Sequence, residues 1–376
     1  MIPIIDLGSD PRERGRLHGD ALRSDVEQNL DIYFRRFAVF GCSRETILSE
    51  SEKWIPHLER LDPEFTTELK GVCEGSGFPM PEITMLNVRY ELYAGLVKQA
   101  ATSAATRVGA DGCTTFAVMP ECTKNHETLI GQNWDWPDLK VMIARVHRKD
   151  KTDFICLGET GTIGGMQGVN QEGLGVVINA LLSAQDGKNA YEKPFRMRVR
   201  DILNARNMHE AILAITATKR VASMNFLIGH ADGEAIDIEA GPDREAFLYP
   251  EAGILTHSNH FCKLEIESDV ARLWPNTMYR NVRLARLLRR SQPLDFDNIK
   301  QQMSDHFAFP HSICAHVDVD EPENIRLETR SSVLISLNAR TMYVTDGVPC
   351  ESEYQKFSLE DSGAEHHPLK TEVVSL

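Results

Sequence analysis

The chain has 376 residues, of which 42% are apolar, 26% charged and 7% aromatic, as in ordinary folded globular proteins. Its formal net charge of −14 argues against general binding to nucleic acids or anionic membranes, because both require basic surfaces. The length allows one large domain or two ordinary ones.

The start of the chain and its cysteines bear on the compartment. The first residues contain no basic segment followed by an apolar core, and no stretch reaches the roughly 18 apolar residues of a spanning helix. We therefore expect a cytoplasmic protein without a signal peptide and without contact with a membrane. The eight cysteines include no CxxC pair, which favours reduced, mostly buried thiols and no zinc site. The sequence indicates neither a metal nor a cofactor.

The first hundred or so residues are predicted to be helical. Asp10 and Asp62 each precede a proline, which is the pattern of a helix cap followed by its first residue. Apolar residues then recur at helical spacing, and a further helical stretch spans residues 82–98. Residues 99–110 are small and weakly hydrophobic, which indicates an exposed linker.

After residue 112 the pattern changes to short strands. Strands are predicted at residues 113–119, 128–134, 141–147, 153–158, 163–169, 174–181, 223–229, 234–240, 244–249, 253–257, 313–317, 332–338 and 341–346. Helices are predicted at residues 195–206, 208–218 and 275–290, the last of them basic and amphipathic, and the tail from residue 360 is expected to be loose. Hairpins interleaved with helices indicate an α+β fold in which helices pack outside antiparallel sheets.

The main candidate for catalysis is Cys113, which stands within the sequence DGCTT directly before an apolar run. Cleavage of the peptide bond between Gly112 and Cys113 would make this cysteine N-terminal. Its α-amine, with a reference pKa of about 8, can then serve as the base for its own thiol. Glycine lacks a Cβ, so the thiol can reach back onto the preceding carbonyl. The alternative is a buried cysteine at the start of a strand.

A second candidate region ends the following strand at residues 131–137 (GQNWDWP). Asp135 stands between Trp134 and Trp136, an arrangement that suits the rim of a pocket. Asp135 can hold the new ammonium group or offer its backbone N–H to an oxyanion. The alternative is a polar strand end with packed tryptophans.

A third candidate region spans residues 255–261 (LTHSNHF). Asn259 carries a side-chain N–H that is a suitable donor to a developing oxyanion. His257 and His260 are expected to point to opposite faces of a strand end, which favours a structural role over metal binding.

Two further motifs are expected to be structural. Residues 161–165 (GTIGG) lack the Lys-Ser/Thr of a phosphate loop and indicate a turn. His311 and Cys314 are expected to diverge on the strand at 313–317, so they do not predict a second catalytic pair.

Short motifs in a fixed order resemble the acyl-coenzyme A:6-aminopenicillanic acid acyltransferase family of N-terminal nucleophile hydrolases. They lie at residues 14–19, 85–89, 111–115, 131–135, 169–181, 257–260 and 312–314, and so span most of the chain. The resemblance implies a four-layer αββα fold with a helical N-terminal segment. It also implies autocatalytic cleavage before Cys113, which gives an α chain of residues 1–112 that stays associated and a β chain of residues 113–376 that carries the αββα core.

The same match implies roles for single residues. Cys113 carries the acyl-enzyme, Asn259 donates to the oxyanion, and Asp135 shapes the site around the new amine. The residues expected to contact substrate are Trp134, Trp136, Asn179 and Thr114.

One departure from the family pattern concerns the substrate. Penicillin-forming members carry an arginine directly after the position of Cys314, where it can meet a substrate carboxylate, whereas this chain has Ala315. The sequence therefore predicts a hydrolase that cleaves a small N-acyl or peptide-like amide through a thioester.

Three other functions stay open. One is an acyltransferase that takes its acyl group from acyl-CoA or an amide. Another is a cysteine hydrolase with a histidine base and no chain cleavage, and the last is a catalytically silent binding protein on the same scaffold. The expected partner is a small-molecule amide substrate, and assembly into a homo-oligomer stays open.

Overall fold

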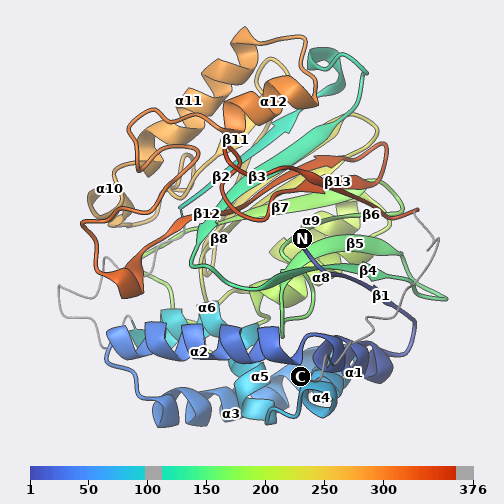
Figure 1. Ribbon diagram of the computed structural model, residues 1–376, viewed down its shortest axis with the longest axis vertical. Coiled ribbons are helices and arrows are strands. Elements are labelled where there is room, and N and C mark those ends of the chain that lie inside the picture. The colour runs from blue at the N-terminus through green and yellow to red at the C-terminus, as the bar shows by residue number, and fades with distance from the viewer. Residues whose placement is uncertain (98–111, 361–376) are drawn as a thin grey trace, which may run out of the picture.

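The computed structural model describes residues 1–97 and 112–360. The first stretch is helical, as predicted, apart from one short strand that was not predicted (Figure 1). It contains β1 (Ile4–Leu7), α1 (Pro11–Ala21), α2 (Arg23–Val39), α3 (Arg44–Leu61), α4 (Pro63–Ser76), α5 (Met80–Asn87), α6 (Arg89–Leu92) and the π-helical turn η1 (Tyr93–Val97). Both predicted caps are confirmed, because the side chains of Asp10 and Asp62 accept backbone N–H groups at 2.8 and 3.0 Å. The expected linker at 99–110 lies outside the described residues.

Helices α1 and α4 cross with their backbones almost in contact, because glycines line both sides. Gly15 lies against Gly71, and Gly19 lies against Gly75. A Cβ built on Gly15 would lie 2.0 Å from the backbone oxygen of Glu68. The glycine spacing in the first family-like motif therefore serves helix packing.

A six-stranded antiparallel sheet carries the predicted site. Its order is β11-β2-β3-β12-β13-β14. The members are β2 (Gly112–Val118), β3 (Leu129–Trp136), β11 (Ile254–His257), β12 (Glu328–Ser336), β13 (Thr341–Val344) and β14 (Gln355–Ser358). Strand β2 begins at Gly112, and its second residue, Cys113, pairs with Trp134 of β3.

An eight-stranded sheet joins the early and late parts of the chain. Its order is β1-β4-β5-β6-β7-β8-β9-β10. The members after β1 are β4 (Val141–Val146), β5 (Phe154–Glu159), β6 (Gln167–Asn170), β7 (Leu174–Ala180), β8 (Met224–His230), β9 (Glu234–Ala240) and β10 (Glu245–Leu248). Strand β1 runs parallel to β4, with Ile4 opposite Ile143, so residues before the proposed cleavage point complete a sheet formed by residues after it.

The two sheets face each other, and helices cover their outer faces (Figure 1). The helical segments outside the sheets are α8 (Phe195–Asn204), α9 (Met208–Thr216), α10 (Val270–Leu273), α11 (Thr277–Arg290), α12 (Phe296–Met303) and the 3-10 turns η3 (Pro120–Cys122) and η4 (Glu323–Ile325). Helix α8 packs on β6 and β7, α11 packs on β2 and β11, and β2 and β3 contact β7 across the interior. The predicted αββα fold is confirmed. No helix in the described part of the chain is long and apolar enough to cross a membrane.

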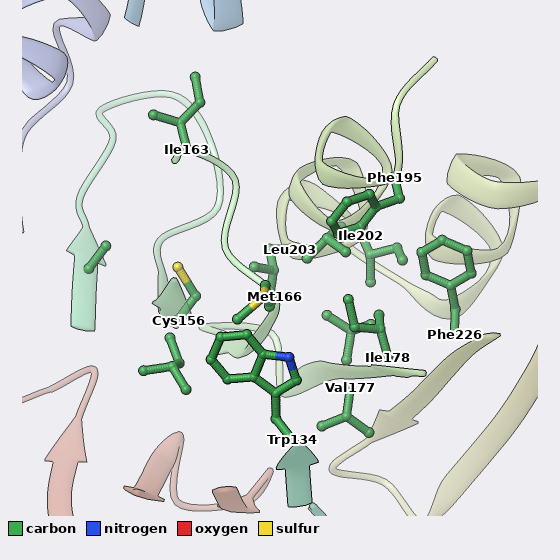
Figure 2. Packing of buried hydrophobic residues seen from close by; sticks show 14 of the residues in the cluster. Trp134, Cys156, Ile163, Met166, Val177, Ile178, Phe195, Ile202, Leu203 and Phe226 are labelled. Atoms are coloured by element: carbon green, nitrogen blue, oxygen red, sulfur yellow. The ribbon is translucent and has the colours of Figure 1, made fainter. Parts of the chain in front are cut away.

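Apolar side chains fill the layer between the sheets (Figure 2). Trp134 points into this layer near Met166 and Cys156, and Phe195 and Leu203 of α8 belong to the same cluster. This close-packed interior fixes the end of β3 on which the predicted site depends.

Two predicted strands differ from the structure. Residues 313–317 form no strand, because the N–H of Cys314 bonds to Asp305 and that of His316 bonds to Pro310 within one compact loop. In the expected strand 163–169 only Gln167–Asn170 is extended. The preceding GTIGG segment is the predicted turn, with positive φ at each of its three glycines.

Candidate active site

Cys113 lies where the edge strand β11 has already ended. The last residue of β11, His257, pairs with Thr115, so Cys113 extends beyond that pairing. Its backbone N–H instead donates to Oδ1 of Asn259 at 2.8 Å. Cys113 is 1% exposed. Because side chains alternate along a strand, Cys113 and Thr115 share the face that looks toward the other sheet.

Asn259 reaches Cys113 from the turn that follows β11. Its Oδ1 accepts hydrogen bonds from Cys113 and from Nη2 of Arg280 at 2.7 Å, while its Nδ2 donates to the backbone oxygen of Ala180 at 3.0 Å. Two donors and one acceptor fix the direction of this amide. Nδ2 carries a second hydrogen, which is the one that can serve an oxyanion. Asn259 therefore holds the nitrogen of Cys113, a contact that the sequence analysis did not foresee.

Arg280 is a site residue that the sequence analysis missed. It projects from α11 and is fully buried. Its Nη1 donates to the backbone oxygen of Cys113 at 2.6 Å and to Oγ1 of Thr114 at 2.7 Å. Burial lowers the pKa of the guanidinium, and the nearby charge of Asp135 opposes that effect. Thr114 thus lies with Arg280, on the strand face opposite to Cys113.

Asp135 lies directly beside Gly112, its cross-strand partner. Its Oδ1 accepts a hydrogen bond from the Thr329 hydroxyl at 2.7 Å. Burial raises the pKa of Asp135 to about 7, although Arg280 and Thr329 act in the opposite direction. A Cβ built on Gly112 would lie 2.6 Å from Oδ2 of Asp135. The glycine therefore makes room for a carboxyl group that can exchange a proton near neutral pH.

Both tryptophans beside Asp135 are buried, at 3% exposure each. Trp134 lies in the core between the sheets (Figure 2). Nε1 of Trp136 donates to the hydroxyl of Tyr33 at 2.8 Å, and its ring stacks on Tyr90 with centroids 6.2 Å apart. Trp136 thereby ties β3 to helices α2 and α6.

Asn179 of β7 faces β2 from the other sheet. Its Oδ1 accepts hydrogen bonds from Thr115 at 2.7 Å and from Asn225 at 3.2 Å, and Asn225 in turn donates to Asp237 at 2.6 Å. Its Nδ2 is buried and has no hydrogen-bond partner among the residues that the structure describes. A buried donor of this kind is costly unless a ligand satisfies it.

The two histidines near Asn259 do not diverge, so that expectation was wrong. Their rings lie 6.3 Å apart and nearly parallel, because the strand ends at His257 and the chain turns. Both ring nitrogens of His257 face acceptors, Oε1 of Glu239 at 2.9 Å and the Ser258 carbonyl at 2.8 Å. Burial alone would lower the pKa of His257, but Asp237 and the hydrogen bonds to Cys262 and Glu239 raise it overall.

His260 is held by a different contact. Its Nδ1 lies 3.0 Å from Oγ1 of Thr277, and burial, with the charges of His257 and Arg280, lowers its pKa to about 4. Because both ring nitrogens of His257 face acceptors and its pKa is raised, neither nitrogen is well placed to remove a proton from a thiol.

The fold and the site together define a class. An αββα core that holds one cysteine by both its backbone nitrogen and its carbonyl, beside a titratable carboxyl, suits an enzyme that transfers acyl groups from amides. A family model for acyl-coenzyme A:6-aminopenicillanic acid acyl-transferases matches residues 122–349, more than half of the chain. The chain belongs to this family and is an enzyme that acts on amide bonds. The matched region contains Asp135, Asn179, Asn259 and Arg280 and begins after Cys113.

Individual relatives were also found. The chain is 26% identical over 328 residues to the 40 kDa form of acyl-coenzyme A:6-aminopenicillanic-acid-acyltransferase from Emericella nidulans. The alignment covers 84% of each chain. A solved structure of conjugated bile acid hydrolase from Clostridium perfringens overlaps 67% of this chain and 94% of its own, with 11% identity and a TM-score of 0.49. Penicillin V acylase from Agrobacterium tumefaciens overlaps 62% of this chain and 83% of its own, with 12% identity and a TM-score of 0.41.

Proposed function

We propose that this chain is a self-processing cysteine amidohydrolase, in which cleavage before Cys113 creates the catalytic N-terminal residue. Its substrate is a small N-acyl or peptide-like amide, and its acyl-enzyme is a thioester on Cys113. The observation that carries the proposal is the contact between the Cys113 nitrogen and Oδ1 of Asn259. A buried backbone N–H needs an acceptor in any case, but here a side chain supplies it, so the same acceptor can still hold and orient this nitrogen once it becomes a free α-amine.

Self-processing uses the Gly112 carbonyl as the first substrate. The Cys113 thiol attacks this carbonyl, a C–S bond forms, and the C–N bond to Cys113 breaks while the thiol proton passes to the departing nitrogen. Water then hydrolyses the thioester, which leaves a carboxylate on Gly112 and a free thiol and amine on Cys113. Asp135, which lies beside Gly112 and has a pKa near 7, is positioned to relay protons in this step.

Turnover repeats the same chemistry on an external amide. The α-amine of Cys113 accepts the thiol proton, and the sulfur attacks the substrate carbonyl. The substrate amine leaves with that proton, and water releases the acid from the thioester. Arg280 fixes the carbonyl of Cys113, and Asn259 turns the lone pair of the amine toward the thiol.

Two amide side chains are suited to hold the oxyanion. Nδ2 of Asn179, on β7, has no hydrogen-bond partner within the described part of the chain. Thr115 of β2 and Asn225 of β8 fix the direction of this amide, because both donate to its Oδ1. The second hydrogen of Asn259 Nδ2 is the other donor. Preorganised donors of this type contribute strongly to acyl-transfer catalysis, about 100-fold or more for one donor.

The direct test is to detect the acyl group bound to Cys113. Wild-type protein is mixed with a panel of N-acyl amides, quenched early, and searched by peptide mass spectrometry for an acyl adduct on Cys113. We expect the adduct in wild type and in Cys122→Ala, a matched change of another buried cysteine, but not in Cys113→Ala. An active Cys113→Ala protein would show that Cys113 is not the nucleophile and would overturn the proposal.

Acyl transfer is the second candidate, because the Emericella nidulans relative is named as an acyltransferase. Hydrolysis is preferred, because Ala315 replaces the arginine expected in penicillin-forming members, and its backbone N–H and carbonyl both bond to Thr329. The assay compares acid and amide products with and without an added amine. Dominant transfer from an acyl-CoA donor would overturn the preference for hydrolysis.

A further inference from the structure

Four metal-ligating side chains converge on one point outside the site around Cys113. His306 follows α12, Cys314 and His316 lie in the loop before β12, and Cys350 lies between β13 and β14. The ligating atoms all lie within 4.8 Å of one another. The sequence analysis expected no zinc site because it searched for local spacing, whereas these ligands come from three separate segments.

The distances between these atoms match a tetrahedron of zinc ligands. With Zn–S near 2.3 Å and Zn–N near 2.0 Å, tetrahedral corners lie about 3.8 Å apart for two sulfurs, about 3.5 Å for sulfur and nitrogen, and about 3.3 Å for two nitrogens. The two sulfurs are 3.6 Å apart. Nε2 of His316 lies 3.6 Å from Sγ of Cys314, 3.4 Å from Sγ of Cys350 and 3.1 Å from Nε2 of His306.

We propose that His306, Cys314, His316 and Cys350 bind one Zn²⁺ ion. Two thiolates and two imidazoles are the ligand set that favours zinc among the common divalent metals. Each thiol loses its proton to solvent on binding, so the site is electrically neutral with the metal in place. Four protein ligands leave no open position, which makes the site structural.

The ion would stabilise a loop that supports the active site. Ala315, between two of the ligands, exchanges hydrogen bonds with Thr329, which donates to Asp135. Nδ2 of Asn133 holds the carbonyl of Ile313 at 2.8 Å. A metal that fixes the positions of residues 314 and 316 therefore also fixes the hydroxyl that binds Asp135. The proposal does not depend on whether Cys113 is a nucleophile.

The test measures zinc in the full-length protein purified without chelators. We expect about one zinc ion per chain in wild type and in His311→Ala, which alters a neighbouring histidine outside the cluster. Cys350→Ser should lose the metal. Chelation should lower the thermal midpoint of wild type, and added Zn²⁺ alone should restore it.

Measurements on the same samples can also overturn the proposal. A zinc-free wild-type protein that takes up no added Zn²⁺, or that holds Cys314 and Cys350 in a disulfide, would overturn the proposal, as would full zinc content in Cys350→Ser. If Cys350→Ser does not fold, protection of both thiols of wild type from alkylation by added Zn²⁺ decides the question. Unprotected thiols would then count against the site.

Discussion

Gly112 and Asp135 approach each other closely at the bond that is proposed to break. The sequence suggested that the glycine frees the thiol of Cys113, but the structure gives it a second purpose, because any Cβ would collide with the Asp135 carboxyl. That carboxyl is fixed by Thr329 and is buried, so it has little room to move away. The residue before the nucleophile is thus constrained by its neighbour across the sheet.

Gly112→Ala should slow self-cleavage strongly, by about tenfold or more, because displacing a catalytic group by as little as 1 Å can cost this much or more. The rate is followed by intact mass after expression of the precursor. Gly8→Ala is the matched control, since a Cβ there meets no atom within 4 Å, and it should cleave as wild type does. Equal self-cleavage rates for the two variants would show that the close approach of Gly112 to Asp135 does not matter for processing.

The raised pKa of Asp135 also predicts how the stability of the folded protein depends on pH. The unfolded chain releases the Asp135 proton near pH 3.8, whereas the folded protein holds it until about pH 7. Folding therefore takes up a proton in this window, and the contribution of Asp135 to stability falls as pH rises from about 4 to about 7, by on the order of 4 kcal/mol.

Asp135→Asn removes this titration. The difference in unfolding free energy, variant minus wild type, should increase between pH 4.5 and pH 8 in urea denaturation. Both proteins are made with Cys113→Ala so that neither is cleaved, and all other titrating groups are then common to both and cancel in the difference. Parallel stability curves across that range would show that Asp135 titrates normally in the fold.

At the scale of elements, helix α11 shows what the sequence can and cannot reveal. Its amphipathic pattern predicted a helix, and Arg280 occupies the same buried row as Leu284 and Leu288, four and eight residues later. An arginine on an apolar face was the signal that could have identified it. Its partners, Cys113 and Asn259, come from distant segments, so the contact itself depends on tertiary structure.

The loop before β12 shows the opposite case. Residues 313–317 resemble a strand in composition, yet their backbone groups bond within the loop and to Thr329. Strand preference is weak and depends on an available neighbour, and the neighbours here are already paired. The convergence of Cys314 with Cys350 was therefore invisible in the sequence. Periodicity alone predicted helices outside antiparallel sheets, while the αββα fold and the roles of Cys113 and Asn259 were expected from the family resemblance that the ordered motifs carry.

The crossing of α1 and α4 supplies a prediction about packing. Gly15→Ala would place a Cβ against the rigid backbone of α4, so it should destabilise the protein by about 2 kcal/mol or more. Asp20→Ala, on the exposed face of the same helix, should stay within about 0.5 kcal/mol. Chemical denaturation measures both. If Gly15→Ala is as stable as Asp20→Ala, close helix contact does not explain the glycine spacing.

At the scale of the whole molecule, residues on both sides of the proposed cleavage point form one folded unit. Strand β1 pairs with β4, and Trp136 bonds to Tyr33. Charged contacts add to this, since Glu159 of β5 pairs with Arg89 of α6 and accepts from Tyr33. Cleavage before Cys113 therefore leaves two chains that are held by a shared sheet and a shared core, and they should separate only under denaturing conditions.

The central claim is that Cys113 becomes an N-terminal residue, and intact-mass spectrometry tests it most directly. Under denaturing conditions wild-type protein should give two masses, one ending at Gly112 and one beginning at Cys113, while under native conditions both should travel together. Cys113→Ala should give one full-length mass. A wild-type protein that hydrolyses amides while remaining a single intact chain would contradict the account.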